Sequence, residues 1–148
     1  MKVKIIHATL GCEDSSCPTI YQNDLEDYLI QGFILDTKVK LALDIPEGED
    51  AVVVPKGFME RYIANRIHMV CKTTYPTCED TNFISPISQN SAGDYYVQGH
   101  ILNSEDKVNL NIPEGEDAVV IQKESIEQYI ALRITMALKR RTLELVTD

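Results

Sequence analysis

The chain of 148 residues lacks several features that would assign it directly to a functional class. No apolar run approaches the ~18 residues that a membrane-spanning helix needs, so we expect no membrane association. Basic side chains are few, with 14 Lys and Arg against 23 Asp and Glu, and the net charge is −9. Because affinity for nucleic acids depends on cations that neutralise phosphates, we expect no direct binding of nucleic acid.

Motifs that mark well-known catalytic chemistry are missing too. The sequence holds neither a Gly-rich phosphate loop nor a His-Glu-x-x-His zinc motif. Its three histidines, His7, His68 and His100, belong to no Ser-His-Asp or Cys-His pattern. We therefore expect no catalytic residues and no cofactor. The apolar stretch near the N-terminus is too short for a signal peptide, which favours a cytoplasmic protein.

Four cysteines, Cys12, Cys17, Cys71 and Cys78, are open to three interpretations. A metal site, helped by nearby histidines, would use Cys-x4-Cys and Cys-x6-Cys spacings, which are looser than those typical of zinc sites. Reduced thiols of a cytoplasmic protein would need no metal, and some would be buried as small apolar groups. Disulfides are the third alternative, but a chain of this length does not need them. We expect reduced thiols and no metal site.

The most informative feature that is present is an internal repeat. Residues 45–53 recur letter for letter as residues 112–120, which is an offset of 67 positions. Between residues 27–67 and residues 94–134, 24 of 41 positions are identical without a gap. No Pro-rich or Gly/Ser-rich linker separates the copies, which we define as repeat one, residues 1–67, and repeat two, residues 68–148.

A single copy would bury too little apolar surface to be stable alone. We therefore expect one domain of class α+β, spanning residues 1–148, in which the two repeats pack about a pseudo-twofold axis. Each repeat is predicted to contain three strands followed by one helix. β-Branched and aromatic residues indicate first strands at 28–35 and 95–102. Third strands are predicted at 51–54 and 118–121.

The second strand of each repeat is predicted from alternation of polar and apolar residues at 38–43 and 107–112. The polar segments 36–37 and 103–106, which precede them, predict hairpin turns.

Helices are predicted after the third strands, because apolar residues then recur at helical spacing. The apolar faces comprise Phe58, Met59, Tyr62, Ile63 and Ile67 in repeat one and Ile126, Tyr129, Ile130, Ile134, Ala137 and Leu138 in repeat two. The second helix is predicted to end near 139–141, where basic residues suit the helix dipole. Short strands are predicted at 1–8 and 143–146.

Glycines and glutamines occupy equivalent places inside the predicted first strands. Gly32 and Gly99 indicate a bulge or a close approach of another backbone segment. Gln31 and Gln98 precede them, and we expect each to bond a buried backbone group across the twofold axis or to face water.

Repeat one also carries three short motifs, Cys17-Pro18-Thr19-x-Tyr21, Tyr28-x-Ile30-Gln31-Gly32 and Leu43-x-Ile45-Pro46-Glu47-Gly48-Glu49-x-Ala51-Val52. Together they resemble a group of small, uncharacterised bacterial proteins, mainly actinobacterial, that carry one copy of the unit. The resemblance covers 17–55 and is partial at 95–121, because Ile84-Ser85-Pro86 replaces the Cys-Pro element. Members often sit beside helix-turn-helix regulators, so the resemblance implies a regulatory context and no catalytic residue.

The identical Pro-Glu-Gly-Glu-Asp segments are the candidate interaction surface. Calcium binding needs a longer loop with alternating oxygen ligands, so we interpret both segments as solvated turns between strands. Their acidic residues are nevertheless available to a basic partner: Glu47, Glu49, Asp50, Glu114, Glu116 and Asp117.

From these observations we predict a non-enzymatic protein-interaction module with a regulatory role. Its partner is expected to be a basic protein that meets an acidic face, with association that weakens as salt rises. The chain itself is expected to be a monomer with internal pseudo-symmetry or a weak homodimer. The alternative is a small-molecule or metal-binding protein, or an enzyme, with its site in the groove between the two repeats.

Overall fold

A computed structural model describes residues 2–9, 17–70 and 85–146, and it includes side chains up to residue 66 in the first long helix and residue 136 in the last. Within these residues the fold is mixed α+β, with four helices and a seven-stranded antiparallel sheet. The class expected from the sequence is therefore confirmed.

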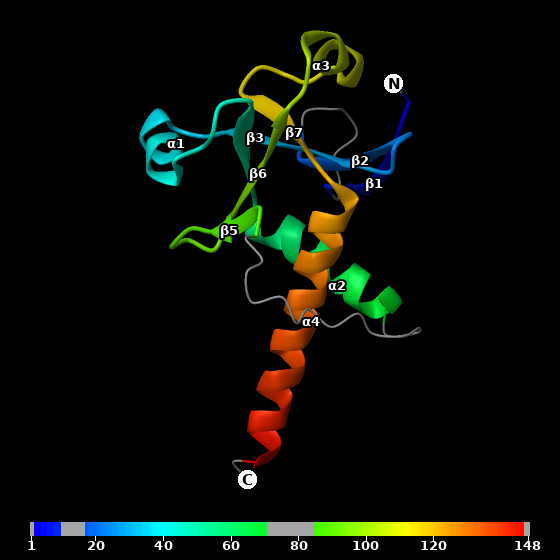
Figure 1. Ribbon diagram of the computed structural model, residues 1–148, viewed down its shortest axis with the longest axis vertical. Coiled ribbons are helices and arrows are strands. Elements are labelled where there is room, and N and C mark those ends of the chain that lie inside the picture. Colours follow the sequence, from blue (N-terminus) through cyan, green and yellow to red (C-terminus); the bar gives the residue numbers. More distant parts are fainter. Residues whose placement is uncertain (1, 10–16, 71–84, 147–148) are drawn as a thin grey trace.

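Both halves of the chain contribute strands and helices in a matching order (Figure 1). The first half contains β1 (Val3–Ala8), β2 (Thr19–Asn23), β3 (Tyr28–Ile34), α1 (Thr37–Leu43), β4 (Glu49–Val54) and α2 (Lys56–Val70). The second half contains β5 (Ile87–Gln89), β6 (Tyr95–Ile101), α3 (Ser104–Leu110), β7 (Glu116–Ile121) and α4 (Lys123–Val146). The strands predicted near 1–8, 28–35, 51–54, 95–102 and 118–121 are confirmed.

The strands of the two halves interleave in the sheet. β3 pairs with β7 along its length, and β4 pairs in the same way with β6. Shorter pairings join β3 to β4 and β6 to β7. These four strands therefore close a ring of backbone pairing, to which β1 and β2 add beside β3 and β5 adds beside β6.

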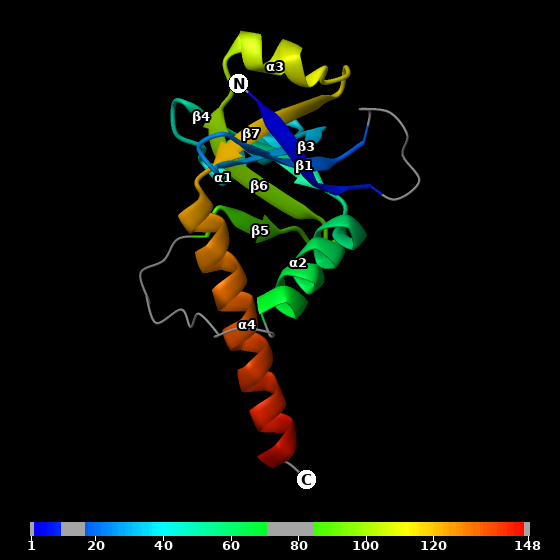
Figure 2. The ribbon, with the colours of Figure 1, turned by 90° about the vertical axis from the view of Figure 1, so that its right-hand side faces the viewer.

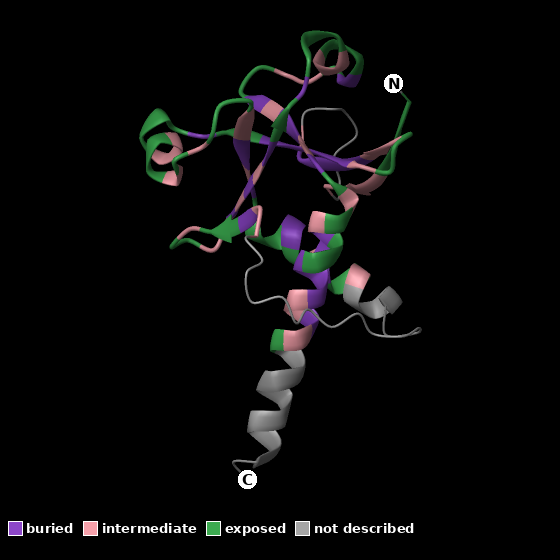
Figure 3. Cartoon of the chain, in the orientation of Figure 1, coloured by how far each residue is buried: buried purple, intermediate pink, exposed green. Residues whose placement is uncertain are grey.

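One hydrophobic cluster lies between this sheet and the two long helices, and a second, smaller one includes Leu29 of β3 and Leu110 of α3. α2 and α4 lie together against one side of the strands, whereas α1 and α3 lie at the opposite end of the sheet (Figures 1 and 2). Purple, buried segments fill the strands and the nearby turns of both long helices in Figure 3. One buried cluster draws on both halves and includes Val52, Met59, Val97, Val119 and Ile126.

The predicted apolar helix faces are confirmed wherever side chains are described. Their buried members are Phe58, Met59, Tyr62 and Ile63 in α2 and Ile126, Tyr129, Ile130 and Ile134 in α4. The side chains of Ile67, Ala137 and Leu138 lie outside the described part.

The predicted second strands are wrong, because 38–43 and 107–112 fall largely within the helices α1 and α3. The carboxylate of Asp36 accepts a hydrogen bond from the Lys38 backbone N–H at 2.9 Å, and the Asn103 side chain accepts one from Asp106 N–H at 2.8 Å. Both residues act as helix N-caps, so the polar segments mark helix starts rather than hairpin turns. In each repeat, a short helix therefore stands where the second strand was predicted.

The prediction for the C-terminal residues is also wrong. α4 runs without interruption from Lys123 to Val146, so the helix does not end near 139–141 and 143–146 is no strand. Leu, Glu and Thr close to the end of a helix leave its backbone ladder intact, since none of them removes an N–H donor as proline would.

The glycines inside β3 and β6 are there because another backbone segment comes close, which confirms the prediction. A Cβ atom on Gly32 would lie 2.7 Å from the carbonyl oxygen of Val53. On Gly99 it would lie 2.5 Å from the carbonyl oxygen of Val120. Both contacts occur where the strands of one repeat meet, so a side chain at either position would force the ring of strands apart.

Candidate functional site

The acidic turns are solvated at their tips. Gly48 and Gly115 have φ of 86° and 88°, a left-handed backbone that favours glycine. Glu47 and Glu114 precede them and are exposed, whereas Glu49 is half-buried at the start of β4. The interpretation as turns between elements holds for the tips, although each turn follows a helix rather than a strand.

The remaining acidic candidates lie in the strands that leave the turns. Asp50 Oδ1 lies 3.1 Å from Lys40 Nζ, and Asp117 Oδ1 lies 3.1 Å from Lys107 Nζ. Glu116 is only 8% exposed. The structure thus places two of the six carboxylates in ion pairs and buries a third, so a basic partner would meet chiefly Glu47 and Glu114.

Only one of the four cysteines is described, and it is not a free thiol. Cys17 is disulfide-bonded and half-buried just before β2, which corrects the expectation of a reduced thiol at this position. Cys12, Cys71 and Cys78 lie outside the described residues. Among the described residues, no group of three or more His, Cys, Asp or Glu side chains is placed to hold a metal ion.

Gln31 is fully buried, and its side chain has two hydrogen-bond partners within repeat one. The Tyr21 hydroxyl donates to its Oε1 at 3.2 Å, and its Nε2 donates to the Cys17 carbonyl oxygen at 3.5 Å. Its counterpart Gln98 is half-buried.

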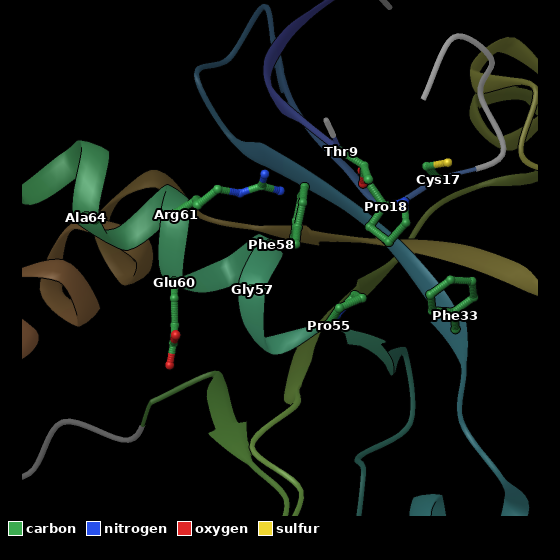
Figure 4. Close-up of a pocket in the computed structure, with 10 residues that line it drawn as sticks. All are labelled: Thr9, Cys17, Pro18, Phe33, Pro55, Gly57, Phe58, Glu60, Arg61 and Ala64. Atoms are coloured by element: carbon green, nitrogen blue, oxygen red, sulfur yellow. The ribbon is translucent and has the colours of Figure 1, made fainter. Parts of the chain in front are cut away.

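A cavity of about 740 Å³ lies beside Cys17, and we call it the repeat-one groove (Figure 4). It lies where the chain approaching β2, the end of β3 and the start of α2 meet. Its lining is mainly apolar and comprises Thr9, Cys17, Pro18, Phe33, Pro55, Gly57, Phe58, Glu60, Arg61 and Ala64. In Figure 4 the Arg61 side chain extends toward Phe58, whereas Glu60 points away from it.

Two aromatic rings define the apolar character of the groove. Phe33 remains 42% exposed, whereas Phe58 is 3% exposed and belongs to the core. The His7 ring packs against Phe58, with ring centroids 4.7 Å apart, and its Nε2 atom donates to the Phe58 carbonyl oxygen at 3.0 Å. Burial, opposed by this hydrogen bond and assisted by the nearby Arg61 cation, lowers the pKa of His7.

The groove lies where the two repeats differ in sequence. Only Glu60 and Ala64 keep the same residue in repeat two, as Glu127 and Ala131. The other aligned positions change in character, with His100 for Phe33, Gln122 for Pro55, Glu124 for Gly57, Ser125 for Phe58 and Gln128 for Arg61. Sequence reasoning missed the groove because it followed the identical positions, whereas the positions that differ between the repeats carry this signal.

Two further cavities are each lined by a single repeat, as the groove is. One, of about 520 Å³, is lined by Lys4, Ile6, His7, Gln22, Tyr28, Tyr62, Asn65 and Arg66. The other, of about 430 Å³, is lined by Lys107, Val108, Asn111, Ile112, Glu116 and Asp117. None of these three cavities spans both repeats, and His100 lines none of them.

No family model matches the chain, and no curated protein or solved structure is significantly similar to it. No helix in the described part of the chain is both long enough and apolar enough to cross a membrane.

Proposed function

We propose that the chain is a non-enzymatic protein-interaction module in which the repeat-one groove receives an apolar segment of a partner protein. The groove is the observation that carries this proposal. It combines an exposed aromatic ring, Phe33, with an arginine, Arg61, and a floor fixed by the buried Phe58. Aromatic residues and arginine are the residue types that contribute most to binding at protein interfaces.

The energetic argument rests on Phe33. Full burial of a phenylalanine side chain gains about 1.5–3 kcal/mol, and Phe33 is only partly covered in the chain alone. A partner that covers the groove would bury the part of the Phe33 ring that is still exposed, and this burial would contribute to the free energy of binding. Small ligands would bury the same surface, but the lining offers them few polar groups to fix an orientation.

The partner is proposed to carry basic residues around its apolar segment. A net charge of −9 attracts a basic protein over long range and accelerates encounter, while the groove supplies the short-range contact. A regulatory context, which the resemblance to small bacterial proteins implies, is consistent with such a module.

The scaffold is proposed to be a tandem duplication packed about a pseudo-twofold axis as one domain. Equivalent pairings support this, because Tyr28 faces Ile121 and Tyr95 faces Val54, each pair shifted from the other by the repeat offset. The ion pairs of Lys40 with Asp50 and of Lys107 with Asp117 repeat in the same way, both at 3.1 Å. The shared core then serves as a rigid frame for a groove that only one repeat forms.

Affinity capture from the native host tests the function. Wild-type chain is compared with Phe33→Ser and with Leu25→Ser, a control that removes an apolar side chain that is 80% exposed and lies outside the groove. We expect a partner that both wild type and the control capture at low salt, that Phe33→Ser loses, and that high salt weakens. Equal capture by all three chains, or no protein partner at any salt concentration, would contradict the proposal.

A further inference from the structure

The cavity of about 520 Å³ has a chemical character opposite to that of the chain as a whole. It lies beside β1, β2, β3 and α2, and cationic side chains enter its lining from two elements, Lys4 from β1 and Arg66 from α2. No carboxylate is among its lining residues, although the chain has a net charge of −9. Its volume is in the range of small-molecule sites.

The equivalent residues of repeat two contact one another directly. Tyr95, Tyr129 and Arg133 are the counterparts of Tyr28, Tyr62 and Arg66. Arg133 Nη1 donates to the Tyr129 hydroxyl at 3.2 Å and to the Tyr95 hydroxyl at 3.3 Å. The Arg133 guanidinium therefore provides a hydrogen bond to both tyrosine hydroxyls, and we call these three residues the closed set.

In repeat one the same three residue types are not joined in this way. The Tyr62 hydroxyl is buried in a side chain that is 3% exposed; it interacts with the Tyr28 side chain, but it makes no hydrogen bond of ordinary geometry with Arg66 or with any other described residue. The Nε atom of Arg66 is also buried and has no hydrogen-bond partner among the described residues, and no described carboxylate lies within ion-pair distance of Arg66 or Lys4. A buried donor left unpaired is costly, so a ligand that accepts from it is expected.

The protonation states in the cavity suit an acceptor that carries negative charge. Burial, the Tyr28 side chain and the Glu127 carboxylate raise the pKa of Tyr62, although Arg66 acts in the opposite direction. The phenol therefore stays protonated and offers its O–H as a donor. Arg66 and Lys4 add positive charge, and Ile6 and the Tyr28 ring offer apolar contact to the rest of a ligand.

From this geometry we infer that the cavity binds a small organic anion through its carboxylate or phosphate oxygens. Arg66, Lys4 and the Tyr62 hydroxyl bind the oxyanion, and the anion does in repeat one what the two tyrosine hydroxyls do for Arg133 in repeat two. This site is distinct from the repeat-one groove, and its ligand would bind whether or not a protein partner is present.

Titration calorimetry on the full chain at constant ionic strength tests the inference, with citrate and inorganic phosphate as the probes. We expect one saturable site for at least one probe, and the probe that binds identifies the oxyanion as carboxylate or phosphate. Arg66→Gln and Tyr62→Phe are each expected to weaken binding roughly tenfold, as loss of a hydrogen bond to a charged group does.

Repeat two supplies the matched controls. Arg133→Gln and Tyr129→Phe make the same chemical changes at the closed set, and they should leave the affinity for the anion unchanged. Lys4→Gln and Lys2→Gln form a second matched pair. Both lysines are exposed, so neither change should affect folding, and only Lys4→Gln should weaken binding because only Lys4 lines the cavity. The inference is overturned if neither probe binds saturably, or if the control variants weaken binding as much as their repeat-one counterparts.

Discussion

The guanidinium of Arg133 donates a hydrogen bond to the hydroxyl of Tyr129, whereas the equivalent hydroxyl of Tyr62 has no partner of ordinary geometry among the described residues. The same substitution should therefore have different effects on stability in the two repeats. Tyr129→Phe is expected to lower the free energy of unfolding by about 1 kcal/mol, because it removes a hydrogen bond. Tyr62→Phe is expected to leave it unchanged or to raise it, and urea denaturation of both variants measures the difference.

Gly32 tests the close approach of strands within the ring. Gly32→Ala is expected to destabilise the chain by about 1–3 kcal/mol, because the added methyl group would overlap the Val53 carbonyl oxygen. Gly57→Ala is the matched control, since nothing lies within 4 Å of a Cβ atom built there and alanine favours a helix. Equal midpoints of thermal unfolding for the two variants would argue against the close approach.

His7 links stability to pH. Because burial lowers its pKa in the folded chain below the ordinary 6.5, the unfolded chain binds the proton more readily. The contribution of neutral His7 is therefore fully present above pH 6.5 and is lost as the pH falls through its lowered value. Urea denaturation at a series of pH values should show this loss, and His7→Gln should reduce it. Arg61→Gln should shift the loss to higher pH, because it removes a nearby cation.

The chain is predicted to need no metal ion. Cys17 is disulfide-bonded and offers no thiolate, which weakens any site built on the four cysteines. Elemental analysis should find no stoichiometric zinc, and a chelator should leave the thermal midpoint unchanged. Stoichiometric zinc with a large loss of stability on chelation would show the prediction to be wrong, since a structural metal contributes directly to folding.

Much of the fold could be predicted from periodicity and from the repeat. Five of the strands and the buried faces of α2 and α4 were predictable because burial imposes a regular spacing on apolar residues. The short helices α1 and α3 were not, because six residues with alternating character fit a strand as well as a helix. Asp36 and Asn103 were the deciding residues, as their side chains cap helices just as readily as they populate turns.

The candidate sites were harder to predict than the fold. The identity of the two acidic segments predicted an interaction surface there, but Asp50 and Asp117 are held in ion pairs with Lys40 and Lys107. The groove and the cationic cavity depend instead on side chains far apart in the sequence, such as Lys4 and Arg66 of the cavity. The cavity also depends on a missing contact, because Arg66 makes no hydrogen bond to Tyr62 like the one that Arg133 makes to Tyr129. Neither property leaves a periodic pattern in the sequence. The groove lies at positions where the residues of the two repeats differ, whereas Tyr62 and Arg66 are identical to Tyr129 and Arg133 and differ from them only in their contacts.

The central claim is that repeat one alone forms the partner-binding groove, and reciprocal exchange of its residues tests this most directly. The measurement is the dissociation constant for the partner that wild type captures at low salt. Phe33→His with Arg61→Gln gives repeat one the residues of repeat two, and we predict roughly tenfold weaker binding or more, as for interface residues of this type. His100→Phe with Gln128→Arg makes the opposite exchange in repeat two and should leave the affinity unchanged. Full affinity in the first double variant, or an equal loss in both, would contradict the account.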